Sequence, residues 1–96
     1  MNRKERRTAR KESESEVTSF LKTADKFIDL ANRENDTVKA TRLHMAFLYA
    51  SARYSAFVAK TILDVQDHEE FVKMLTNEYR DYLRQNLADD GLAGPG

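Results

Sequence analysis

The chain has 96 residues, 41% of them hydrophobic and 33% charged, so it can form at most one small domain. It contains no cysteine, which excludes disulfides, thiolate metal sites and cysteine nucleophiles. The 16 basic and 16 acidic side chains cancel overall, but their distribution is uneven. Residues 1–11 carry six Lys or Arg against one Glu, a net charge of +5, and the remainder carries −5. These numbers predict an acidic body with a basic arm.

Residues 1–12 have almost nothing to bury, and we interpret them as a flexible or partly helical arm. No apolar run follows them, so we expect no secretory signal and a cytoplasmic location. The arm either binds nucleic acid or an anionic membrane through its charge, or acts as a solubilising tail. It has no aromatic side chain to stack on bases, and the acidic body repels phosphates. The candidate nucleic-acid residues are Arg3, Lys4, Arg6, Arg7, Arg10 and Lys11.

A first helix is predicted over residues 13–33. Ser13 and Glu16 have the spacing of a capping box, in which each side chain bonds a backbone N–H at a helix start. The polar residues after this helix include three candidate caps for the next one, Asn35, Asp36 and Thr37. Apolar residues recur at helical spacing along the first helix: Val17, Phe20, Leu21, Ala24, Phe27, Ile28 and Ala31.

A second helix is predicted over residues 37–63, and it is apolar on two sides. Such a helix must be covered on both sides, which makes it the centre of a bundle or of a dimer. The first stripe consists of Leu43, Ala46, Phe47, Ala50, Tyr54, Phe57, Val58, Ile62 and Val65. The second stripe consists of Met45, Leu48, Ala52, Ala56, Ala59 and Leu63.

A third helix is predicted over residues 68–88. Asp67 and Glu70 repeat the spacing of a helix cap, and Gly91 is expected to supply the left-handed residue that ends the helix. Residues 91–96 are expected to be a disordered tail. The apolar stripe of this helix consists of Phe71, Val72, Leu75, Tyr79, Tyr82, Leu83 and Leu87.

No segment alternates with period two, so we expect no strands. Three helices with two short connections predict an all-α, up-down-up three-helix bundle over residues 13–90, with pairing into a dimer left open. The predicted core consists of Phe20, Phe27, Ile28, Phe47, Ala50, Tyr54, Phe57, Phe71, Leu75 and Tyr79.

No pattern of catalytic, cofactor or metal residues stands out. His44 has no metal-ligating residue three or four positions away, and His68 has only Asp64. Ser51 and Ser55 lie among alanines, where we expect small packing residues. Every glycine follows residue 90, so there is no phosphate-binding loop. We therefore expect a protein that is not an enzyme and holds no cofactor.

One polar strip on the second helix has two interpretations. Its residues are seven, four and seven positions apart, so they share a face. Either the strip binds an anion or a protein partner, or its cations pair with acids on neighbouring helices, such as Asp25, Asp29 or Glu78. The strip consists of Arg42, Tyr49, Arg53 and Lys60.

Two blocks of sequence resemble a family of small, uncharacterised bacterial proteins classed as a domain of unknown function. The blocks are FIDLANREN at 27–35 and LYASARYSAFVA at 48–59. They are similar to the patterns F-I-x-L-A-N and L-Y-A-x-A-R-[FY]-x-A-F. The resemblance implies a small, all-helical cytoplasmic protein, and it transfers no activity.

The leading hypothesis for function is a protein-interaction or regulatory module with an unknown protein partner, because the chain places its residues on helix faces. A nucleic-acid-associated protein that acts through the basic arm is the alternative. Self-association is also predicted, through the second apolar stripe of the central helix: Met45, Leu48, Ala52, Ala56, Ala59 and Leu63.

Overall fold

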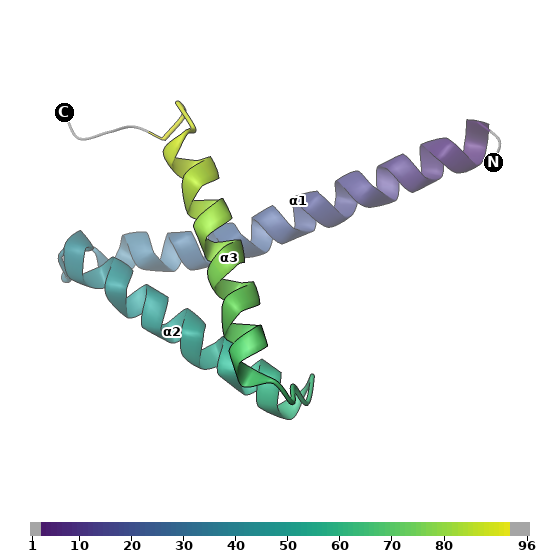
Figure 1. Ribbon diagram of the computed structural model, residues 1–96. Helices are drawn as coiled ribbons and strands as arrows, with labels where there is room; N and C mark the ends of the chain where they lie inside the picture. Colours follow the sequence, from purple (N-terminus) through teal and green to yellow (C-terminus); the bar gives the residue numbers. More distant parts are fainter. Residues whose placement is uncertain (1–2, 93–96) are drawn as a thin grey trace. The chain divides into compact units, whose positions relative to one another are not determined.

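The computed structural model describes residues 3–92, with side chains from residue 15 onward. The chain forms three helices: α1 (Arg3–Glu34), α2 (Ala40–Thr61) and α3 (His68–Leu87) (Figure 1). Residues 3–92 contain no strand. The predicted all-α class with three helices is therefore confirmed. The last residues of the predicted tail, 93–96, lie outside the described residues.

Helix α1 begins at Arg3, well before the predicted start at residue 13. Ser13 and Glu16 lie inside the helix, so the predicted capping box at its start is wrong. Arg, Lys, Glu and Ala dominate residues 3–12, and these residue types favour a helix even where no apolar face is present. The side chains of the basic arm lie outside the described part, so their binding role stays a prediction.

The chain divides into two compact units, Met1–Ser51 and Ala52–Gly96, and the boundary falls within α2. In the first unit, α1 and the start of α2 form a helical hairpin. The rings of Phe27 and Phe47 meet edge to face, with centroids 6.5 Å apart and planes inclined at 81°. This contact joins α1 to Phe47, which belongs to the first apolar stripe of α2.

Helix α2 starts at Ala40, later than predicted. The carbonyl of Lys39 accepts the first helical hydrogen bond, from the N–H of Leu43 at 2.9 Å. The predicted caps Asn35, Asp36 and Thr37 are therefore wrong. The hydroxyl of Thr37 instead donates to the carbonyl of Glu34 at the end of α1. The polar residues of this connection thus complete the first helix and do not begin the second.

The second unit is also a helical hairpin, formed by the end of α2 and by α3. After α2 ends at Thr61, Asp64 adopts a left-handed backbone with φ 50°, which Asp tolerates better than most residues. Asp67 caps α3, because its carboxylate accepts the N–H of Glu70 at 3.1 Å. This part of the predicted capping pattern is confirmed, and it fixes where α3 begins.

The end of α3 differs from the prediction. The helix ends at Leu87, and the following residue, Ala88, keeps a right-handed backbone. Gly91 is not left-handed, so its predicted role is wrong. Its N–H donates instead to the carboxylate of Asp89 at 2.9 Å. The side chain of Asp89 thus stabilises the turn that follows α3.

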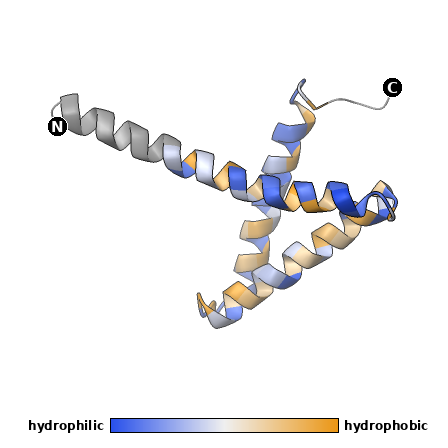
Figure 2. Cartoon of the chain, turned by 180° about the vertical axis from the view of Figure 1, so that it is seen from behind, coloured by the Kyte–Doolittle hydropathy of each residue, from blue (hydrophilic) through white to orange (hydrophobic). Residues whose placement is uncertain are grey.

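The predicted core does not form within either unit. Among residues 15–92 only Ala59 is buried, with 5% of its surface exposed. Phe71 and Leu75 are half-buried. Each unit has a single interface between two helices, and this interface covers only part of each apolar stripe. Figure 2 shows that hydrophobic residues occur along both α2 and α3. The predicted core residues that the structure leaves exposed are Phe20, Phe27, Ile28, Phe47, Ala50, Tyr54, Phe57 and Tyr79.

In the described part of the chain, no helix combines the length and the apolar character that crossing a bilayer requires.

Candidate functional site

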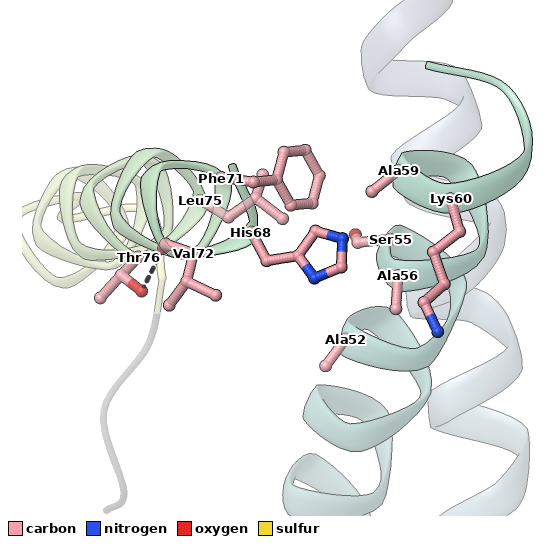
Figure 3. A pocket seen from close by; sticks show the side chains of 10 residues that line it. All are labelled: Ala52, Ser55, Ala56, Ala59, Lys60, His68, Phe71, Val72, Leu75 and Thr76. Atoms are coloured by element: carbon pink, nitrogen blue, oxygen red, sulfur yellow. Dashed lines mark hydrogen bonds between the residues drawn. The ribbon is translucent and has the colours of Figure 1, made fainter. Parts of the chain in front are cut away.

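The second unit contains an apolar groove between the end of α2 and the start of α3. Its volume is about 350 Å³, which lies within the range of small-molecule pockets. Figure 3 shows the side chains of both helices that face it. The residues that line the groove are Ala52, Ser55, Ala56, Ala59 and Lys60 from α2, and His68, Phe71, Val72, Leu75 and Thr76 from α3.

The wall on α2 is made of small side chains. Ala52, Ala56 and Ala59 are spaced by four and three residues, so they lie one above another on a single face. Ala59 is the most buried residue among those described, and it also lines the groove. The methyl side chains leave room between the helices, and that room is the groove.

The wall on α3 carries larger apolar side chains. The cap at Asp67 sets the start of the helix, and Phe71, Val72 and Leu75 then line the groove. The hydroxyl of Thr76 donates to the carbonyl of Val72 at 2.7 Å, so its polar atom is already paired (Figure 3). This wall therefore presents hydrocarbon and suits an apolar occupant.

Three polar side chains also line the groove. The imidazole of His68 points from α3 toward α2, and Ser55 and Lys60 belong to α2 (Figure 3). Figure 3 marks no hydrogen bond between the described residues Ser55 and His68. The groove can thus hold an apolar group, and Lys60 can bind an acceptor beside it.

The histidines do not assemble a metal site in the described part of the chain. Residues 15–92 contain no group of three or more His, Asp or Glu side chains suited to a metal ion. His44 is exposed on α2. His68 faces the groove and not a cluster of carboxylates.

The predicted polar strip lies along α2, and all four of its residues are exposed. Only Lys60 lines the groove. Because Arg53 is exposed, it does not need the carboxylate partner that a buried cation requires. Arg42 and Tyr49 belong to the first unit and are not among the residues that line the groove.

Within its own unit, the strip forms no ion pair with an acid of the neighbouring helix in the described part of the chain. Among the described side chains the one ion pair is Arg80–Asp81, at 3.4 Å on the surface of α3. Among the described side chains of each unit, Arg42 is not paired with Asp25 or Asp29, and Arg53 and Lys60 are not paired with Glu78. A role of the strip in binding an anion or a protein stays a prediction.

The predicted self-association stripe is divided by the structure. Ala52, Ala56 and Ala59 line the groove against α3, so α3 of the same unit already covers part of them. Met45 and Leu63 are more than half exposed, and Leu48 is exposed to 38%. The sequence contained the signal for this groove, because an alanine face and a stripe of large side chains stand on either side of one short connection.

One family matches the chain, and its model covers residues 20–90. It is described as a "Protein of unknown function (DUF3144)". The chain belongs to this family. Both blocks that carried the resemblance, 27–35 and 48–59, lie within the matched residues, as do all the residues of the groove. No curated protein and no solved structure matches the chain.

Proposed function

We propose that this family member is a protein-interaction module whose exposed apolar helix faces are covered by a protein partner. One observation carries the proposal: among residues 15–92 only Ala59 is buried, while large hydrophobic side chains on all three helices are exposed. Large exposed apolar patches on a folded protein are typical of interaction surfaces. A partner that removes them from water gains about 25 cal/mol per Å².

Several of the exposed side chains are large aromatic groups. Tyr54 and Tyr79 are exposed to 68% and 51%, and Phe27 and Phe57 to more than half. Aromatic side chains of this kind dominate the binding energy of protein interfaces. The proposed role is therefore a non-catalytic one, and a cytoplasmic location remains part of the proposal.

A photo-crosslinking experiment in cells tests the proposal. A benzoylphenylalanine placed at Tyr79 or at Phe57 is expected to give a covalent protein adduct on illumination. The matched control is the same probe at Arg84, an exposed polar position on α3. Adducts with a protein partner only at the apolar positions support an interaction module. Equal yields at all three positions, or none, would contradict it.

Nucleic-acid binding through the basic arm is the second candidate function. The observation that favours it is the separation of charge, +5 over residues 1–11 against −5 over the remainder. Attraction to phosphates follows from charge alone, and it is independent of the apolar faces. The two candidates therefore involve different parts of the chain and can be tested separately.

A further inference from the structure

We infer that the partner is a second copy of this chain, an inference that rests on the proposed function. In the arrangement that we propose, the end of α3 from each copy enters the groove of the other. The groove lies beside the first half of α3, where Phe71 and Leu75 line it. Large side chains on the second half of α3 have no cover within their unit. Each copy thus offers both a groove and the groups to fill it.

The filling groups are Tyr79, Tyr82 and Leu83. They are exposed to 51%, 47% and 45% in a helix that otherwise carries many charged residues. The opposite wall of the groove is formed by alanines of α2, which leave space for large side chains. Large groups and a groove lined by small ones are complementary in size, as in the packing of helix knobs into holes.

Helix geometry allows each copy to insert its side chains into the groove of the other. Leu75, Tyr79 and Tyr82 follow each other by four and three residues, so they share one face of α3. If two copies of α3 run antiparallel with their centres near Asn77, then Leu75 of one copy lies opposite Tyr79 of the other. By the same count Val72 lies opposite Tyr82. A two-fold pair of this kind fills both grooves at once.

The exposed area is sufficient for a specific pair. The α3 face includes five large side chains that are 45–78% exposed, Val72, Tyr79, Tyr82, Leu83 and Leu87. A half-exposed aromatic side chain leaves about 100 Å² in water, so this face offers on the order of 500 Å² per copy. Two copies then bury about 1,000 Å², the size at which a specific interface begins. The walls of the groove add to this area.

Charges at the groove are also complementary between copies. Lys60 lines the groove, and among the described side chains it forms no ion pair. Glu78 comes directly before Tyr79 and points about 100° around α3 from it, so a second copy that inserts Tyr79 brings a carboxylate to the edge of the inserted face. A small apolar ligand would fill the groove but would leave Tyr82 and Leu83 in water. A second copy covers the groove and these side chains together.

The oligomeric state of the full chain tests this inference. By sedimentation equilibrium at micromolar concentration we expect twice the mass of one chain. Leu83→Glu and Ala56→Glu place a charge on the filling group and on the groove wall, and each should weaken dimerisation at least 100-fold. Gln85→Glu is the matched control, because it adds the same charge to α3 beside this face and should leave the dimer intact. Circular dichroism well below the Tm measures whether each variant keeps its helices.

The register has its own test, which uses the lack of cysteine in the chain. A chain with Leu75→Cys is mixed with a chain with Tyr79→Cys under mild oxidation. Because these positions face each other across the proposed two-fold axis, the mixture should form disulfide-linked dimers in several-fold higher yield than either chain alone. Equal yields would overturn the antiparallel arrangement.

The outcomes separate this inference from the proposed function. If the chain is a monomer and crosslinks to other proteins through Tyr79, the proposed dimer is wrong and the proposed interaction function is supported. A monomer without such adducts would contradict both. A dimer that survives both Leu83→Glu and Ala56→Glu would show that copies associate through a different face, and this would overturn the arrangement proposed here.

Discussion

At the scale of single residues, the turns are set by a few side chains with specific hydrogen bonds. Asp67 begins α3 by accepting the N–H of Glu70, and Asp64 ends α2 with its left-handed backbone. At the start of α2, the cap position is held by Lys39, whose side chain has no acceptor to offer. Local sequence rules therefore succeed at one of these helix starts and fail at the other.

The cap at Asp67 gives a direct stability prediction. Asp67→Ala removes the acceptor of the Glu70 N–H and should lower the free energy of unfolding by about 1 kcal/mol. Asp67→Asn is the control, because an amide oxygen also caps helices and should restore most of the loss. Urea denaturation followed by circular dichroism measures both. Equal losses in the two variants would show that the charge of the carboxylate, and not its hydrogen bond to Glu70, stabilises the helix.

At the scale of whole helices, α2 accounts for most of the architecture. Its first stripe meets α1 through Phe47, and its second stripe meets α3 through Ala56 and Ala59. The sequence predicted that neighbouring helices pack on both apolar stripes of α2. In the structure α1 contacts one stripe and α3 contacts the other. The basic segment is different, because α1 extends through it without an apolar face.

The basic segment of α1 gives a prediction about nucleic acid. If its six cations bind phosphates, the affinity for duplex DNA should fall steeply with salt, with a log–log slope of up to about −5. Deletion of residues 1–11 should abolish that binding, because the remaining chain has a charge of −5. Fluorescence anisotropy at two or more salt concentrations measures it. If the chain without residues 1–11 still binds DNA, or if the affinity does not change with salt, the basic segment does not bind through its charge.

At the scale of the whole molecule, stability is expected to depend on association. Each unit leaves most of its large apolar side chains in water, so a single chain gains little from the hydrophobic effect. A second copy that covers them binds the folded state and not the unfolded one. Folding and pairing should then be coupled.

Coupled folding makes the melting temperature depend on protein concentration. Each tenfold rise in concentration stabilises a folded dimer by about 1.4 kcal/mol, so Tm should increase steadily from low to high micromolar concentration. Leu83→Glu should lower Tm and make it independent of concentration. Calorimetry or circular dichroism at several concentrations measures this. A wild-type Tm that stays constant would show that the chain is stable alone.

The sequence by itself determined the helices, because their apolar periodicity and the cap at Asp67 are local properties. It also determined which faces are apolar, including the alanines of α2 and the stripe that contains Phe71. It did not determine where α1 begins, since residues 3–12 favour a helix by propensity without any apolar pattern. Tertiary structure then brought the alanine face of α2 and the apolar stripe of α3 together as the two walls of the groove. In the folded unit the alanine face stays partly open and Tyr79 and Tyr82 stay about half exposed, and no local pattern in the sequence predicts this.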